Sequence, residues 1–164
     1  MTPDTQVVEL MGRHRLMNEL LRDGLEVAAP VRDRGVDVIA YADLTAPVAK
    51  FSAKPIQMKA FSTAGFSVAT KHSRISDLLM AYVWHVNEQS PAITYALSYA
   101  DAVKVAEEMG WTKTTAWTSG GVYTTTRPSE RLIVLIDPFR VVPGRWRALV
   151  VGESVSGEPA NGGT

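Results

Sequence analysis

The polar side chains with the clearest chemical potential lie in two largely apolar stretches, residues 36–41 and 55–60. Asp37 opens the first stretch, and Gln57 and Lys59 stand two residues apart in the second. Successive residues of a strand point to opposite faces of a sheet, so Gln57 and Lys59 are predicted to share a face. If the two stretches pair as strands, a carboxylate, an amide and an ammonium meet at one place. Burying such groups costs hydration, which favours a functional purpose.

The spacing Asp37-x(19)-Gln57-x-Lys59, with Gly35 two residues before the aspartate, resembles the active-site motif of the PD-(D/E)XK nuclease superfamily. These restriction-endonuclease-like proteins include Mrr-type enzymes and Holliday-junction resolvases. The resemblance implies that Asp37 is the motif aspartate, that Gln57 stands in place of the second acid, and that Lys59 is the motif lysine. It also implies an α/β fold with a restriction-endonuclease-like αβββαβ core, in which helices flank a mixed sheet.

A metal-dependent DNA endonuclease, using Mg²⁺ or Mn²⁺ to hydrolyse phosphodiester bonds, is the function that this resemblance implies. Asp37 would be the anionic metal ligand, Gln57 a neutral oxygen ligand, and Lys59 the group that stabilises developing charge. Mg²⁺ prefers carboxylate oxygens, so a second carboxylate, from Glu9 or Asp33, is expected to join the site. A homodimer is a further expectation, because many such nucleases use two sites to address two strands.

Residues 6–23 are predicted to form an amphipathic helix that stops at Gly24. Its apolar stripe consists of Val7, Leu10, Met11, His14, Met17, Leu20 and Leu21. In the nuclease superfamily the first helix usually supplies a glutamate to the metal site, and that position falls at Arg13 here. Glu9 lies one turn earlier on the same face, where it either reaches the site or forms an i,i+4 ion pair with Arg13. The ion pair is the commoner arrangement on helices.

A second hypothesis belongs to a different class of function. Arg13 and Gln57, standing where acids are expected, would be explained if the protein kept the nuclease fold, lost catalysis, and served as a nucleic-acid-binding or assembly module. Asp37 and Lys59 would also have an ordinary structural explanation as a cross-strand ion pair.

The whole chain favours a single domain over residues 1–151, followed by a disordered tail at residues 152–164 that lacks an apolar pattern. The absence of cysteine excludes a disulfide framework, zinc–thiolate sites and cysteine nucleophiles, and agrees with a cytoplasmic location. No apolar run is long enough to span a bilayer, and the first residues do not read as a signal peptide, so no membrane partner is expected.

DNA is the expected partner, although the formal net charge of the chain is zero. Basic residues outnumber acids in residues 30–75 and 111–150, and acids dominate residues 76–110. If the two basic segments share a face, a neutral protein can still present a phosphate-binding surface. The candidate contacts are Arg32, Arg34, Lys54 and Lys71. Scattered, solvated side chains are an equally good explanation.

The remaining elements are predicted from periodicity and turn residues. Strands are expected at residues 25–29, 66–70, 81–87 and 93–97. Helices are expected at residues 73–80, at residues 98–110 with Ser98 as the cap, and at residues 129–136, although residues 132–136 alone could also be a buried strand. The Thr- and Trp-rich segment suggests a C-terminal hairpin that pairs residues 114–118 with residues 122–126. Trp111 and Trp117 could stack on bases, although core packing is the commoner use of tryptophan.

Overall fold

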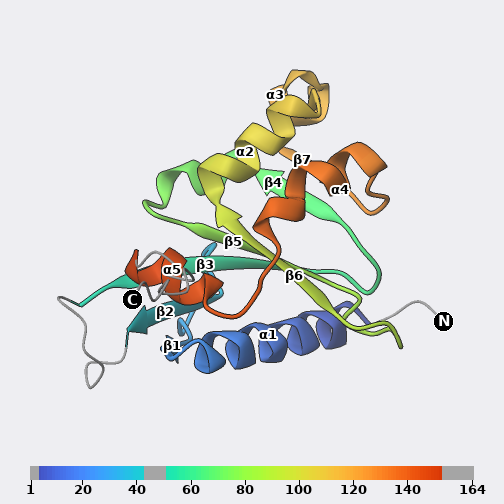
Figure 1. The fold of residues 1–164 in the computed structure, drawn as a ribbon. Helices are drawn as coiled ribbons and strands as arrows, with labels where there is room; N and C mark the ends of the chain where they lie inside the picture. The colour runs from blue at the N-terminus through green and yellow to red at the C-terminus, as the bar shows by residue number, and fades with distance from the viewer. Residues whose placement is uncertain (1–3, 43–50, 153–164) are drawn as a thin grey trace, which may run out of the picture.

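A computed structural model describes residues 4–42 and 51–152, and its centre is a five-stranded mixed sheet (Figure 1). The strands lie in the order β1-β2-β3-β5-β6, where only β3 and β5 are parallel neighbours. Their bounds are Leu25–Ala28 for β1, Val38–Ala42 for β2, Ala53–Ala60 for β3, Leu79–Trp84 for β5 and Ile93–Ser98 for β6. A second sheet pairs β4 (Phe66–Ala69) with β7 (Val122–Thr125). The fold is therefore mixed α/β.

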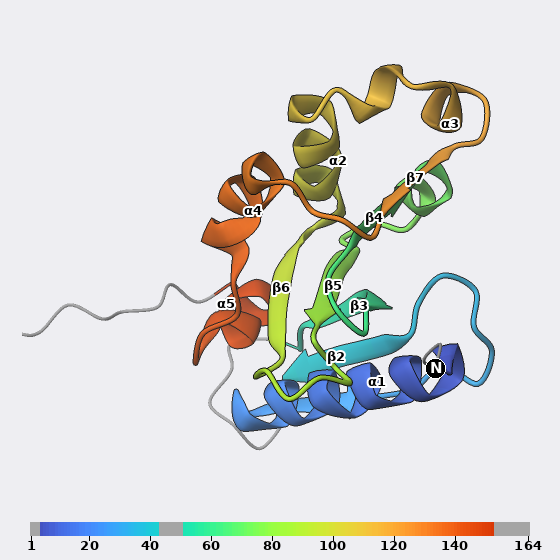
Figure 2. The same cartoon turned by 90° about the vertical axis from the view of Figure 1, so that its right-hand side faces the viewer.

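Helices cover both faces of the larger sheet (Figures 1 and 2). Helices α1 (Thr5–Arg22) and α5 (Arg145–Val151) lie on one side. Helices α2 (Tyr99–Glu108) and α4 (Glu130–Ile136), together with β4, lie on the other. The short helix α3 (Thr115–Thr118) extends beyond α2. Within residues 4–42 and 51–152, no helix combines the length and hydropathy that a membrane span needs.

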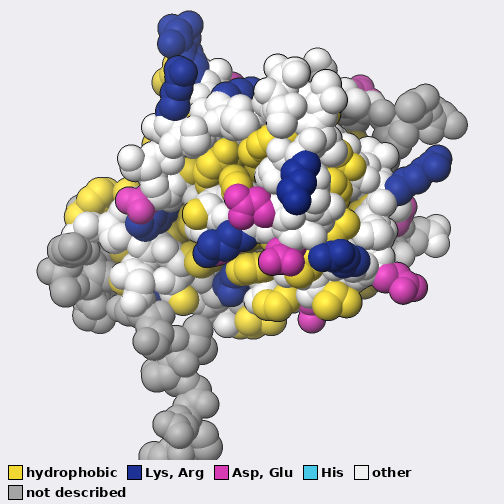
Figure 3. Space-filling model, turned by 90° about the horizontal axis from the view of Figure 1, so that it is seen from above, with side chains coloured by type: hydrophobic (Ala, Val, Ile, Leu, Met, Phe, Trp, Pro, Cys, Tyr) yellow, Lys and Arg dark blue, Asp and Glu magenta, His cyan; other side chains and the backbone are white. Residues whose placement is uncertain are grey.

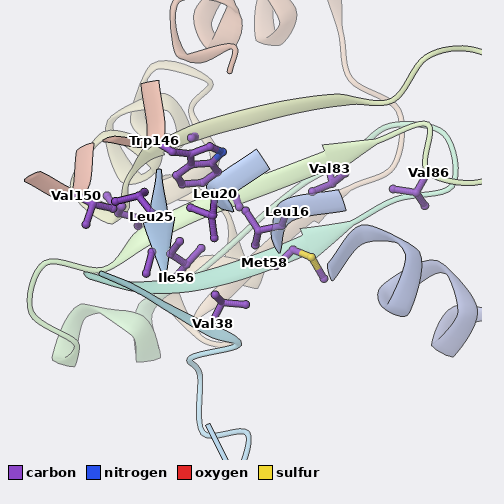
Figure 4. Packing of buried hydrophobic residues seen from close by; sticks show 14 of the residues in the cluster. Leu16, Leu20, Leu25, Val38, Ile56, Met58, Val83, Val86, Trp146 and Val150 are labelled. Atoms are coloured by element: carbon purple, nitrogen blue, oxygen red, sulfur yellow. The ribbon is translucent and has the colours of Figure 1, made fainter. Parts of the chain in front are cut away.

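Each face of the sheet carries its own hydrophobic core. On the α1 side, Leu16 and Leu20 pack against Ile56 and Trp146 (Figure 4). On the α2 side, the aromatic residues Phe66 and Tyr82 stack with their ring centroids 4.3 Å apart. All six residues of β5 are buried, because this central strand contributes side chains to both cores. The rest of the molecule is organised around β5 and its parallel neighbour β3.

Several predicted elements are confirmed with shifts of one or two residues at their ends. The first helix occupies Thr5–Arg22 and is followed by β1, and the second begins after the predicted cap Ser98, whose side chain accepts from the Asp101 amide. Helix α4 also forms as predicted, with Ser129 as its cap. The predicted disordered tail lies outside the described residues apart from Gly152.

The helix predicted at residues 73–80 is wrong. This segment holds a 3₁₀ helix, Thr70–Arg74, and then enters β5 at Leu79. Asp77 adopts a left-handed backbone with φ of 57°, which an α-helix cannot include. The following residues are buried on both faces of the sheet, and an apolar run of this kind fits a central strand as well as a helix. The expected αβββαβ order is thereby broken, since no α-helix lies between β3 and β5.

The predicted C-terminal hairpin is also wrong. Thr114 accepts a hydrogen bond from the Trp117 amide and caps α3, so residues 115–118 are helical. Strand β7 instead pairs with β4, more than fifty residues earlier in the chain. Trp111 is buried and stacks on Tyr123 with ring centroids 4.4 Å apart, so it serves the core rather than a nucleic-acid surface.

Helix α1 is rotated relative to the predicted stripe. The face turned to the sheet consists of Val8, Gly12, Leu16 and Leu20. Most of the predicted stripe, Val7, Leu10, Met11 and Leu21, is exposed to solvent. The reason is visible at Gly12, where a Cβ atom would lie only 2.5 Å from the Cβ of Ala60 on β3. The helix approaches the strand so closely that only glycine fits, and this contact fixes its rotation.

The contact between Gly12 and Ala60 predicts that the effect of Gly12→Ala on the free energy of unfolding changes sign when Ala60 is replaced by glycine. Gly12→Ala is expected to destabilise the protein by about 1–3 kcal/mol through overpacking against Ala60. In an Ala60→Gly background the same change is expected to stabilise it, because alanine favours a helix over glycine by about 1 kcal/mol. Urea unfolding of the four proteins measures the coupling. Equal effects in both backgrounds would contradict the close approach of α1 and β3.

Candidate functional site

The site begins where β2 stops and β3 continues. The last residue pair of these antiparallel strands is Val38 with Ile56, and the Asp37 amide still donates to the Ile56 carbonyl at 2.9 Å. Beyond this point the Met58 amide on β3 has no strand partner on the β2 side, and the Asp37 carboxylate takes that place. Its Oδ2 atom accepts from the Met58 amide at 2.7 Å. The side chain thus satisfies a buried backbone donor that would otherwise be unpaired.

Gln57 lies directly beside this carboxylate, as the sequence predicted. Its Nε2 atom donates to Asp37 Oδ2 at 2.6 Å and to the Met58 carbonyl oxygen at 3.2 Å. Asp37 and Gln57 are each only 6% exposed. Two oxygens therefore converge on one positively polarised atom inside the protein. The backbone carbonyl of Met58 is a site group that the sequence motif did not reveal. Every residue has a main-chain carbonyl, so the residue type does not indicate which one lies in a site.

Burial raises the pKa of Asp37 above the ordinary aspartate range, and this is the largest influence on the group. The Met58 amide opposes the rise by its hydrogen bond, and the nearby Asp33 carboxylate adds to it. The positive charges of Arg13 and Lys59 act in the opposite direction to Asp33 and lower the pKa. Asp37 is thus a desolvated acid between a like charge and two cations, an arrangement that is common at functional sites.

Arg13 brings a cation of the chain itself to this acid. Its Nη2 atom lies 3.9 Å from Asp37 Oδ1 and 3.0 Å from Glu9 Oε1. The predicted i,i+4 pair of Glu9 and Arg13 is therefore confirmed. The buried Nε atom of Arg13 has no hydrogen-bond partner among the described residues. The nuclease resemblance implies an acid at this position of the helix. The structure instead has the Arg13 guanidinium, which lies between the carboxylates of Glu9 and Asp37.

Asp37, Gln57 and Met58 line a cavity of about 570 Å³ between the start of α1, the end of β3 and the β4–β7 sheet. Its lining includes Glu9, Asp33, Asp37, Gln57 and Lys59, together with the hydroxyl side chains of Thr5, Ser62, Ser67 and Thr124. The structure thus brings together the three predicted catalytic residues and both candidate second carboxylates.

Lys59 is partly buried in this cavity and forms no hydrogen bond or ion pair within the described part of the chain. The alternative of a cross-strand ion pair between Asp37 and Lys59 is therefore wrong, because the basic group within 4 Å of Asp37 is Arg13. An ammonium group that opens into a cavity without a partner is available to bind an anion.

The predicted nucleic-acid contacts lie outside this cavity. Lys54 forms an ion pair with Asp77 at 3.4 Å, and Arg32, Arg34 and Lys71 are exposed. On the face that carries α2, α3 and α4, Lys and Arg side chains are separated by acidic and hydrophobic ones (Figure 3). This face presents no continuous basic stripe.

His72 is a buried polar residue that sequence reasoning missed. It is 2% exposed, and its Nδ1 atom has no hydrogen-bond partner among the described residues. Burial lowers the His72 pKa, and the charges of Lys59 and Lys71 lower it further. Gly35, with φ of 94°, passes so close that a Cβ atom there would lie 3.6 Å from the ring. Its position in a 3₁₀ turn follows no periodic pattern, so no signal in the sequence singled it out.

The donors present suit a hard cation only in part. Within residues 4–42 and 51–152, no cluster of three or more His, Cys, Asp or Glu side chains is arranged to hold a metal ion. Gln57 Nε2 donates to both Asp37 Oδ2 and the Met58 carbonyl oxygen, so a cation between these two oxygens would have to displace that amide group. The two oxygens are of the type that Mg²⁺ accepts.

Comparison with protein-family models, with curated proteins and with solved structures finds no match to this chain.

The raised pKa of Asp37 predicts how stability depends on pH. A carboxyl whose pKa is higher in the folded protein than in the unfolded chain stabilises the fold when protonated, and this contribution is lost as the pH rises through the folded pKa. The wild type is therefore expected to gain stability relative to Asp37→Asn as the pH falls from about 7 to about 4. Urea unfolding of both proteins across this range measures the difference. A wild type that loses stability relative to the variant at low pH would refute the assignment.

Proposed function

We propose that this cavity binds a phosphodiester group of DNA and hydrolyses it with the help of a divalent cation. The observation that carries the proposal is the meeting of Asp37, Gln57 and the unpartnered Lys59 in one cavity. An acid and a free ammonium side by side can receive a cation and a phosphate together. The order α1-β1-β2-β3, which fits the first four of the six elements of the αβββαβ core, also supports it.

Different residues would bind the cation and the phosphate. Asp37 would provide the anionic ligand, the Met58 carbonyl would provide a neutral oxygen, and Glu9 or Asp33 would add a second carboxylate from the cavity wall. Gln57 would add a neutral oxygen once its side-chain amide had turned its Oε1 atom toward Asp37. When bound, Mg²⁺ or Mn²⁺ supplies positive charge to the phosphate and activates water at neutral pH. Lys59 neutralises the negative charge that develops on the non-bridging oxygens of the phosphate.

The first test compares metal-dependent cleavage of mixed DNA substrates by the wild type and by Lys59→Ala. Removing a charge that stabilises the transition state is expected to lower the cleavage rate at least about 100-fold. Lys104→Ala is a matched control, because Lys104 is an exposed lysine on α2 that pairs with Asp101, and neither residue lines the cavity. The absence of cleavage by the wild type with either Mg²⁺ or Mn²⁺ would rule out the hydrolytic function.

A specific observation favours a second candidate, a DNA-binding module without catalysis. Arg13 already places positive charge 3.9 Å from Asp37 and holds Glu9 at 3.0 Å, so both carboxylates have a cation without any metal. Asp37 also has a structural task as the acceptor for the Met58 amide. In this candidate Lys59 would face a backbone phosphate directly, and Arg13 would hold the two carboxylates.

Binding measured in the presence of a chelator separates the two candidates. The module is expected to bind DNA without divalent cations, and Lys59→Ala is expected to reduce the slope of log K against log salt by about 1. Fluorescence anisotropy at several salt concentrations measures this slope, with Lys104→Ala again as control. Binding that disappears on chelation would exclude the metal-independent module.

A further inference from the structure

The cavity that Asp37 lines contains one cation and one aromatic ring. Of the described residues in its lining, Lys59 is the only basic one and Phe61 the only aromatic one. Its volume of about 570 Å³ lies within the range of about 300–1,000 Å³ in which pockets enclose one small organic molecule. A nucleotide has this size, whereas a DNA duplex covers about 1,000–2,500 Å² of strongly basic protein surface. The cavity therefore suits one nucleotide of a chain.

The ammonium group and the aromatic ring lie on the same side of β3. Phe61 follows the last residue of this strand, and its amide donates to the Val83 carbonyl at 2.8 Å, which continues the pairing of β3 with β5. Residues two apart in an extended strand point to the same face, with their Cα atoms about 7 Å apart. A nucleotide whose phosphate contacts Lys59 can therefore place its base on Phe61.

The Phe61 ring packs on the backbone of Gly65. A Cβ atom at Gly65 would overlap the ring, so only glycine fits there. Hydrogen bonds hold both residues: the Phe61 carbonyl accepts from the Val86 amide at 3.3 Å, and the Gly65 carbonyl accepts from Trp84 Nε1 at 2.7 Å. Phe61 is only partly buried, and part of its surface lines the cavity. An aromatic ring that is already held in place loses little side-chain freedom when a base stacks on it.

Hydroxyl groups on another wall of the cavity can bind the polar edge of a base. Ser67 Oγ and Thr124 Oγ1 are hydrogen-bonded to each other at 2.8 Å, and Ser62 also lines the cavity. Two paired hydroxyls use one hydrogen for their own bond and keep one further O–H donor and free lone pairs. Because Ser and Thr hydroxyls can both donate and accept, this wall does not require one particular base.

We propose that the cavity takes one unpaired nucleotide of single-stranded DNA, with its phosphate on Lys59 and its base stacked on Phe61. The inference rests on the proposed function and names the form of DNA that the site accepts. Proteins that bind single strands combine cations for the backbone with aromatic rings for the bases. In a duplex both faces of each base are covered by its neighbours, and a base enters a pocket only after it unpairs and unstacks at a cost in free energy.

Fluorescence anisotropy tests this preference with an oligothymidylate of about 12 nucleotides, alone and annealed to its complement. Each form is measured with a chelator and with Ca²⁺, which takes oxygen ligands as Mg²⁺ does. The single strand is expected to bind at least about tenfold more tightly than the duplex, which corresponds to about 1.4 kcal/mol.

Variants of Phe61 test the role of the ring. Phe61→Leu keeps an apolar side chain against Gly65, and it is expected to weaken single-strand binding at least about fivefold without changing duplex binding. Phe61→Tyr keeps the aromatic face and is expected to bind within about twofold of the wild type. Phe139→Leu is a matched control, because Phe139 is partly buried against the same core and does not line the cavity. Urea unfolding checks that each variant folds.

The single-strand preference and the proposed hydrolysis can fail independently. Equal affinity for both forms of DNA, or equal effects of Phe61→Leu and Phe139→Leu, would overturn the single-strand inference, and duplex cleavage that depends on Lys59 would leave the hydrolytic function intact. A single-strand preference that depends on Phe61, without cleavage in Mg²⁺ or Mn²⁺, would rule out hydrolysis and support the inference. A wild type that binds neither form would overturn both.

Discussion

The structure around the cavity depends on one hydrogen bond, from the Met58 amide to the Asp37 carboxylate at 2.7 Å. It lets β3 run beyond the end of β2 without leaving a buried donor unpaired, and the extra length of β3 carries Lys59 into the cavity. The same bond holds Asp37 in a desolvated position, where burial disfavours the ionised carboxylate and the Met58 amide offsets part of that effect.

The sequence predicted the centre of the site better than its surroundings. Asp37, Gln57 and Lys59 were expected to meet because alternation along two apolar strands gives each side chain a definite face, and they do line one cavity. Arg13 was expected only as a departure from a pattern. Its approach to Asp37 depends on the rotation of α1, which the contact between Gly12 and Ala60 decides. Contacts of this kind join residues that are distant in the chain, and they produce no periodic pattern in the sequence.

The larger errors share a physical cause. Residues 78–84 are apolar throughout because β5 is buried on both faces, so periodicity could not separate strand from helix at their start. The β7 segment was paired with its nearest neighbour in the chain, whereas the open edge of β4 lies far away in sequence. The apolar stripe of α1 was assigned to the core, since a helix with two apolar faces does not say which of them the sheet takes. Local patterns define elements well and leave their partners undetermined.

The pairing of β4 with β7 has a consequence for the order in which the protein folds. Strand β4 lies in the connection between β3 and β5, and its only sheet partner in the described chain is made after β5, β6 and α2. Closing so long a loop is slow compared with forming the local contacts of α1 or α2. Ser67 and Thr124, which come from this pair, form one wall of the cavity. During synthesis, a ribosome-bound chain that ends before β7 would hold the motif residues but not the finished pocket.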